Sequence, residues 1–147
     1  MYPKEEAQRL KTAFWIAFDE ASPRKWIRYD TKIKDFSFKF GIDRKRVEVG
    51  LYIEHKDPEL RTIYYQKIES LKSLLETYFT EELYWDSAQI LDSGKVIAKI
   101  WVEKHGLSVM NQNHWEAIFD FFITQMDAFE HFFWEYEEYI RNLEINT

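Results

Sequence analysis

The chain has 147 residues, of which 46% are hydrophobic and 18% aromatic, and its formal net charge is −6. This length predicts a single domain spanning residues 1–147, and the apolar content excludes disorder for the bulk of the chain. The absence of cysteine excludes disulfide scaffolds, thiolate zinc sites and cysteine nucleophiles.

The first helix is expected over residues 4–20, where apolar residues recur at helical spacing, and Ser22-Pro23 is expected to end it. Pro3 is expected at the first helical position. From Phe36 onward, every second residue is apolar up to Ile42. The alternation resumes at Val47 after the polar stretch 43–46, which predicts a β-hairpin with one buried face.

Asp57-Pro58-Glu59 is typical of a helix start, with an acidic cap followed by proline at the first position. A period of 3.6 residues then predicts a helix to about residue 79. A second hairpin is expected from residues 83–91 and 95–103, joined by Asp92-Ser93-Gly94, with a loop at 106–112.

The last helix is expected over residues 114–143, with Asn113 as its cap and Glu116 completing a capping box. Its apolar positions recur in alternating steps of four and three residues. Such a seam packs across a sheet or forms a coiled coil with another chain. We therefore keep self-association through the helix 114–143 as an alternative, with the end after Phe133 projecting toward a partner.

The predicted fold class is α+β in the order helix–hairpin–helix–hairpin–long helix, with an antiparallel or mixed sheet covered by helices. The start of the chain is charged and lacks the apolar core of a secretory signal. Nowhere does an apolar run approach the roughly 20 residues of a membrane helix. A cytoplasmic location without a membrane partner is the resulting expectation.

The charges are unevenly distributed along the sequence. From Arg24 to Arg46, nine Lys or Arg and three Asp leave a balance of +6, whereas from Leu107 to Thr147 eight acidic residues and one Arg leave −7. Two interpretations of this pattern stay open. The two segments form solvated faces of opposite charge, or residues 24–46 form a basic binding surface and the opposite side of the domain is acidic.

Within residues 24–46, cations stand beside aromatic residues, as backbone tracking and base stacking on nucleic acid require. The exposed hairpin tip is the expected phosphate contact. The candidate nucleic-acid-binding residues are Arg24, Lys25, Trp26, Arg28, Arg44, Lys45 and Arg46. Trp26 is either a core residue or a stacking platform.

A weaker catalytic alternative consists of Asp43, Glu54 and Lys56, because restriction-type nucleases use an Asp followed by Glu-x-Lys to hold Mg²⁺ and to activate water. Acid-x-Lys occurs three times in this charged chain, and Asp43 is expected a full strand length from Glu54. No histidine has ligand spacing with another, although Asp127 and His131 stand four residues apart on one helix. We therefore predict no catalytic residue, metal or cofactor.

Several segments resemble a bacterial "domain of unknown function" family over nearly the whole chain. They are Trp26-Ile27-x-Tyr29-x-Thr31, the phenylalanine strand, Leu51-Tyr52-Ile53-Glu54-His55-Lys56-Asp57-Pro58, Tyr84-Trp85-Asp86 and Trp115-x-x-Ile118. The family has short standalone members common in Bacteroidetes, and related domains accompany nuclease-like or restriction-associated modules. The resemblance supplies no catalytic residues and implies at most a DNA-linked role.

The leading functional hypothesis is a non-enzymatic binding or interaction domain, associated with DNA through residues 24–46 in a defence or repair setting. Two alternatives stay open: a structural homodimer built on the C-terminal helix, and a Mg²⁺-dependent restriction-type nuclease.

Overall fold

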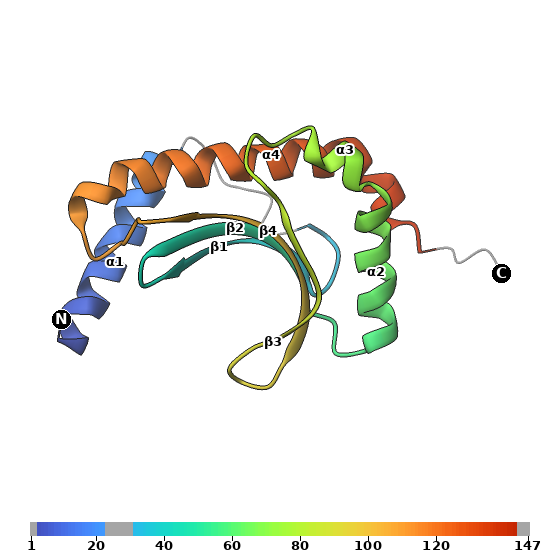
Figure 1. Ribbon diagram of the computed structural model, residues 1–147, viewed down its shortest axis with the longest axis horizontal. Coiled ribbons are helices and arrows are strands. Elements are labelled where there is room, and N and C mark those ends of the chain that lie inside the picture. The colour runs from blue at the N-terminus through green and yellow to red at the C-terminus, as the bar shows by residue number, and fades with distance from the viewer. Residues whose placement is uncertain (1–2, 23–30, 144–147) are drawn as a thin grey trace.

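A computed structural model describes residues 3–22 and 31–143 of the chain and confirms the α+β fold class. Four strands form one sheet in the order β1-β2-β4-β3, and every neighbouring pair is antiparallel. The helices cover one side of this sheet, which curves away from α4 (Figure 1). The elements are α1 (Lys4–Ala21), β1 (Phe36–Asp43), β2 (Arg46–Ile53), α2 (Pro58–Ser70), α3 (Lys72–Glu76), β3 (Tyr84–Ile90), β4 (Val96–His105), a 3₁₀ turn (Gln112–His114) and α4 (Trp115–Arg141).

The first hairpin follows from the alternation of apolar and polar residues in β1 and β2. Phe36 pairs with Ile53 at one end and Asp43 with Arg46 at the other, so only Arg44 and Lys45 form the turn. The turn is two residues shorter than expected because Asp43 and Arg46 continue the ladder.

The second helix begins as predicted, because the Asp57 carboxylate accepts a hydrogen bond of 3.0 Å from the backbone N–H of Glu59. Its predicted extent to residue 79 is wrong, since the chain leaves helical geometry at Leu71 and divides into α2 and α3. Ser70 Oγ donates to the carbonyl of Lys67 at 2.6 Å, a local bond that favours bending or ending a helix.

The second hairpin joins the first through β4, whose residues 98–105 pair with β2. On its other side β4 pairs with β3, where a bulge between Asp86 and Gln89 shifts the register. The bulge turns the end of β3 relative to the rest of the sheet. The residues of β4 therefore face partners on both sides, and β4 and β2 are the two central strands.

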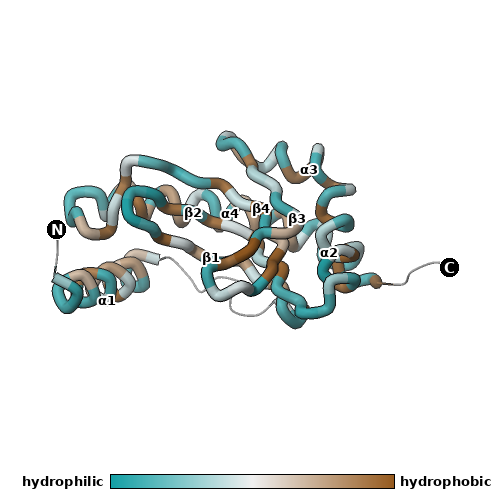
Figure 2. The backbone as a smooth tube through the Cα atoms, turned by 60° about the horizontal axis from the view of Figure 1, so that its bottom comes forward, coloured by the Kyte–Doolittle hydropathy of each residue, from teal (hydrophilic) through white to brown (hydrophobic). Residues whose placement is uncertain are grey.

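The core lies between the convex face of the sheet and the helices α4 and α1. Phe122 of α4 is fully buried and contacts the rings of Phe14, Phe18 and Phe40. The centroids of the Phe122 and Phe40 rings are 4.6 Å apart. Along α1, hydrophilic and hydrophobic residues alternate every few positions (Figure 2). This spacing is typical of a helix that buries one apolar stripe against the core. The largest fully buried side chains are those of Phe14, Phe36, Phe38, Phe122, Phe129, Phe132, Phe133, Leu51, Ile53, Ile68, Leu75 and Ile97.

Two details at the helix starts differ from expectation. Pro3 precedes α1 instead of occupying its first position. Asn113 does not cap the last helix: Asn111 caps the preceding 3₁₀ turn by accepting from the N–H of Asn113, and α4 begins at Trp115. Within the described ranges, none of the helices combines the length and the apolar character needed to cross a bilayer.

Candidate functional site

The concave face of the sheet carries polar side chains, and none of the described helices lies over it (Figure 1). Val47, Val49 and Leu51 of β2 point into the core, so the alternate residues of this strand point to the concave face. The strand register adds residues from the neighbouring strands. The face is formed by Lys39, Gly41, Arg46, Glu48, Gly50, Tyr52, Lys99, Trp101 and Glu103.

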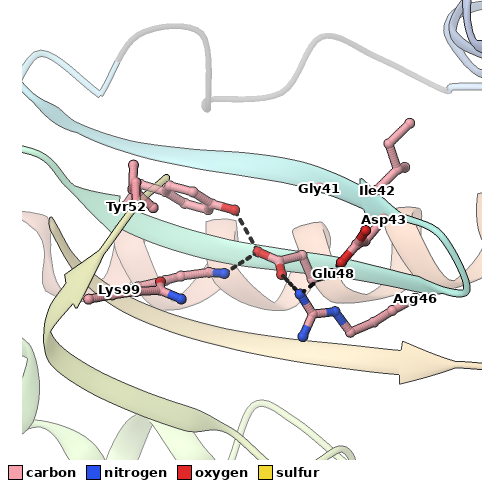
Figure 3. A pocket seen from close by; sticks show the side chains of 9 residues that line it. Gly41, Ile42, Asp43, Arg46, Glu48, Tyr52 and Lys99 are labelled. Atoms are coloured by element: carbon pink, nitrogen blue, oxygen red, sulfur yellow. Dashed lines mark hydrogen bonds and ion pairs between the residues drawn. The ribbon is translucent and has the colours of Figure 1, made fainter. Parts of the chain in front are cut away.

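A buried ion pair lies at the centre of this face. Lys99 Nζ is 2.6 Å from Glu48 Oε2, and the Tyr52 hydroxyl donates to the same oxygen at 2.5 Å (Figure 3). The Glu48 and Lys99 side chains are only 7% and 8% exposed. Burial, together with the neighbouring Glu48 charge, raises the pKa of Tyr52 well above its ordinary value, so this hydroxyl stays a donor.

A second carboxylate, Glu103, is held directly across the strands from Glu48. Trp101 Nε1 donates to Glu103 at 2.6 Å, and His105 Nε2 lies 2.6 Å from its other oxygen. Arg46 reaches both carboxylates, at 3.7 Å from Glu48 and 3.5 Å from Glu103. Burial alone would raise the pKa of Glu103, but the bonds from Trp101 and His105 and the Arg46 charge lower it.

A third carboxylate, Glu54, stands just beyond the end of β2. Lys39 Nζ contacts it at 2.7 Å and Lys95 Nζ at 3.1 Å. Burial opposes ionisation here too, but the two lysine hydrogen bonds outweigh it and lower the pKa of Glu54.

The three carboxylates lie beneath the cations that bind them. Glu48, Glu103 and Glu54 have side chains that are 7%, 10% and 16% exposed. The cations that reach over them are far more open: the side chain of Arg46 is 36% exposed, that of Lys95 44% and that of Lys39 45%. The carboxylates therefore fix the positions of cationic groups that a partner can touch.

Two strand glycines make room for this arrangement. A Cβ on Gly41 would stand 2.7 Å from Glu48 Cγ, and one on Gly50 would stand 2.7 Å from Trp101 Cβ. Glycine inside a strand weakens it and often marks a close approach. Here the missing side chains let Glu48 and Trp101 lie across the neighbouring strands.

A hollow of about 250 Å³ opens beside the buried ion pair, between the end of the first hairpin and the β3–β4 hairpin. It is lined by Gly41, Ile42, Asp43, Arg46, Glu48, Tyr52, Gln89, Leu91 and Lys99. Gln89 lines this hollow, and its side-chain oxygen is buried without a hydrogen-bond partner among the described residues. This site combines pre-positioned cations with nearly buried carboxylates, which suits binding better than catalysis.

Residues 10–137 match the model of a family described as "Domain of unknown function (DUF4268)". The chain belongs to this family. Searches of curated proteins and of solved structures gave no match. Membership of DUF4268 therefore agrees with the resemblance, and it leaves the activity to be inferred from the site.

The nuclease triplet is not assembled by the fold. Asp43 and Glu54 stand at opposite ends of the first hairpin, and eight strand residues span about 26 Å. Because β2 ends at Ile53, Lys56 lies in a bend outside the sheet. Within the described residues, no three carboxylate or histidine groups are placed to hold one metal ion.

The predicted nucleic-acid contacts separate into three groups. Arg24, Lys25, Trp26 and Arg28 lie outside the described residues. Arg44 and Lys45 are exposed in the turn, as expected for a hairpin tip. Arg46 is turned toward Asp43, Glu48 and Glu103, so it belongs to the ion-pair network of the concave face.

The apolar seam of the last helix packs on the sheet of the same chain. Phe122, Met126, Phe129 and Phe133 are buried there. The expectation that the helix end projects is wrong: Ile140 is fully buried, and Arg141 donates to the carbonyl of Thr31 at 2.5 Å. The side chain of Lys67 on α2 donates to the carbonyl of Tyr139.

Sequence reasoning missed the ion-pair network. Glu48 and Tyr52 were recognised only as the polar side of a strand, and Lys99, Trp101 and Glu103 were not singled out. The pairing of β2 with β4 brings together residues about fifty positions apart, which periodicity alone does not encode. The available signal was Gly50, a glycine in the middle of an otherwise regular strand.

Proposed function

We propose that the chain is a non-enzymatic binding domain that holds nucleic acid on the concave face of its sheet. The observation that carries this proposal is the layering of charge, with exposed cations fixed above nearly buried carboxylates. Retaining a buried ion pair on a sheet face is costly, since removing each ion from water costs several kcal/mol. An apolar or a fully solvated sheet face would serve the stability of the fold equally well. A function in binding explains why this face has a buried ion pair instead.

Further cations stand at the hairpin tip, at the end of the sheet. Arg44 and Lys45 are exposed there. In β4, His105 pairs with Arg46 on the concave side, whereas the exposed Lys104 pairs with Val47 and stands at the strand end on the convex side. The N–H of Gly106 donates to the carbonyl of Lys45 at 2.8 Å, which fastens the end of β4 to the turn. Arg44, Lys45 and Lys104 thus form a basic tip, a name we use for these three residues, suited to phosphate contacts.

The overall negative charge does not argue against this partner. Exposed acidic residues of α4, among them Glu116, Asp120, Glu135 and Glu138, belong to the helix on the convex side of the sheet. Exposed charges separated by more than about 8–10 Å are largely screened at physiological salt. The partner therefore meets the local field of the concave face, and the acidic side disfavours binding in the opposite orientation.

The proposal extends to a bacterial cytoplasmic setting in defence or repair. The resemblance to domains that accompany nuclease-like modules supports this setting, as does a sequence without cysteine.

The test is fluorescence anisotropy of labelled single- and double-stranded DNA, titrated with the protein from low to physiological salt. The variant Arg44→Ala/Lys45→Ala/Lys104→Ala removes the basic tip. The control Lys4→Ala/Arg9→Ala/Lys11→Ala removes three exposed cations from α1 and changes the net charge equally.

We expect binding that weakens with salt, and a salt slope that is shallower by about 2–3 in the tip variant because each lost phosphate contact lowers it by about 1. The α1 control should keep the wild-type slope. The absence of binding at low salt, or equal losses in both triple variants, would contradict the proposal.

A further inference from the structure

Two aromatic residues, which we call the aromatic pair, lie on the concave face toward the β3 edge of the sheet. Tyr84 of β3 stands directly opposite Trp101 of β4, and Trp101 stands opposite Gly50 of β2. Residues that pair directly share one face of a sheet. The next residue, Trp85, makes an edge-to-face contact with Tyr65 of α2 on the helix side. The side chain of Tyr84 therefore points the other way, to the concave face.

Trp101 is the fixed member of the aromatic pair. Its indole N–H donates to Glu103 at 2.6 Å, and Lys99 Nζ lies 4.4 Å from the centroid of its ring. Gly50 has no side chain, which lets Trp101 lie close to β2. A ring that is already held in position loses little further freedom when a partner binds beside it.

Tyr84 is the open member of the aromatic pair. Its ring stacks on that of Trp101, with the centroids 5.6 Å and the planes 28° apart. Even so, 38% of Tyr84 is exposed. Because Trp101 covers only one side of the Tyr84 ring, a further flat group can extend the stack on the other side.

The charges near the aromatic pair separate two kinds of contact. Lys39 of β1 stands opposite Gly50 in the same row across the sheet, and its side chain is 45% exposed. At the other end of this row, Glu82 and Asp86 flank Tyr84 along the chain. The acidic residues disfavour a phosphate beside Tyr84, whereas the lysine favours one toward β1. An uncharged flat group therefore suits the ring of Tyr84.

We infer that Tyr84, supported by Trp101, stacks one unpaired base of a single strand of nucleic acid. The inference rests on the proposed function and adds the type of strand to it. In a duplex the neighbouring bases cover both faces of each base, so only an unstacked base of a single strand offers a face to Tyr84. The protein therefore prefers single strands, whose phosphates next to the bound base run toward Lys39 and Arg46.

The test separates base stacking from backbone binding. Three labelled probes of equal strand length are titrated by fluorescence anisotropy: a normal single strand of DNA, a fully abasic single strand, and a duplex. The abasic strand keeps every phosphate and lacks every base, so the ratio of the two single-strand affinities measures the contribution of the bases.

Two variants change the stacking ring in different ways. Tyr84→Ala removes the ring, and Tyr84→Phe keeps the ring without its hydroxyl. Tyr139→Ala is the matched control, because Tyr139 is a 46% exposed tyrosine of α4, on the opposite side of the sheet. Circular dichroism and thermal unfolding establish that each variant is folded.

A crosslinking experiment adds a measurement on the wild-type protein alone. A single strand that carries iodouracil crosslinks under ultraviolet light to an aromatic ring stacked on that base. Digestion and mass spectrometry identify the crosslinked peptide, and we expect it to contain Tyr84.

Wild-type protein, Tyr84→Phe and the Tyr139→Ala control should bind the normal strand about tenfold more tightly than the abasic strand, as expected for one stacked base. They should also prefer the normal strand to the duplex. Tyr84→Ala should bring the ratio of normal to abasic affinity close to one. Its affinity for the abasic strand and its salt slope should stay unchanged, because the phosphate contacts remain.

The outcomes distinguish this inference from the proposed function. Salt-dependent binding of the wild type with equal affinity for the normal and abasic strands would overturn the stacking site and leave the proposed function standing. A base preference that survives in Tyr84→Ala, or crosslinks that map only to other residues, would do the same. The absence of DNA binding at low salt would overturn both.

Discussion

The convex face of the sheet is packed with aromatic rings beneath α4, whereas the concave face of the same strands carries ion pairs that no described helix covers. Residues that alternate along β2 belong to these two environments, as Val49 and Glu48 do. Apolar burial contributes roughly 25 cal/mol per Å² and needs no fixed direction. Ion pairs near a surface contribute little net stability and depend on geometry. The comparison teaches that the fold depends on the convex face, while the concave face is organised for a partner.

The largest effect is expected from breaking the convex side. Phe122→Ala should lower the free energy of unfolding by about 3–5 kcal/mol, because it removes a fully buried ring that contacts Phe14, Phe18 and Phe40. Urea unfolding followed by circular dichroism measures the change. The control is Trp134→Ala, which truncates a half-exposed ring on the same helix and should cost about 1 kcal/mol or less. Equal losses in the two variants would contradict the assignment of the core.

The next effect concerns the buried ion pair. Lys99→Met should cost about 3 kcal/mol, since it leaves the Glu48 carboxylate without its closest cation. The double variant Glu48→Gln/Lys99→Met should recover most of this loss, because it removes the uncompensated charge as well. Urea unfolding of both singles and the double completes a double-mutant cycle. Additive losses would show that the two groups do not act as a pair.

The smallest effect is a loss of stability in acid that occurs in two steps. Burial lowers the pKa of His55 in the folded state, so its contribution is complete above the ordinary value of about 6.5 and declines as the pH falls below it. Glu54 and Glu103 have lowered pKa values, so their contribution is present above about 4.5 and is lost as the pH falls through the folded values.

Thermal unfolding from pH 8 to pH 3 separates the two steps. His55→Phe keeps a ring that can stack on Tyr64, and it should flatten the pH dependence of stability just below about pH 6.5 while preserving the drop below about pH 4.5. Glu54→Gln should reduce only the lower step. A His55→Phe curve parallel to that of the wild type would rule out His55 as the source of the upper step.

The two regions also differ in how far sequence predicted them. The first hairpin and the start of α2 were predictable because their signals are local: alternation along two strands, and Asp57 before Pro58. The apolar seam of α4 was predictable, but whether it packs on the sheet or on another chain depends on the whole fold. The break at Leu71 was not predictable from periodicity, since the Ser70 hydrogen bond interrupts an apolar pattern that continues through it.

The concave site was less accessible to prediction because it is assembled by pairing between distant strands. Glu48 meets Lys99 only through the β2–β4 ladder, and Gln89 reaches the hollow only after the bulge in β3. The clustering of cations at 24–46 did identify the exposed turn at Arg44 and Lys45. It overestimated Arg46, whose guanidinium is turned toward three carboxylates of the folded chain.

The most direct test of the account is an NMR titration of ¹⁵N-labelled protein with a short single strand of DNA. The account predicts shifts in the backbone amides of Lys39, Tyr52 and Lys99 and in the indole N–H of Trp101, which donates to Glu103 on the concave face. The amides of α4 between Trp115 and Arg141 should stay in place. Shifts confined to α4, with the Trp101 indole signal unchanged, would contradict the claim that the concave face is the binding surface.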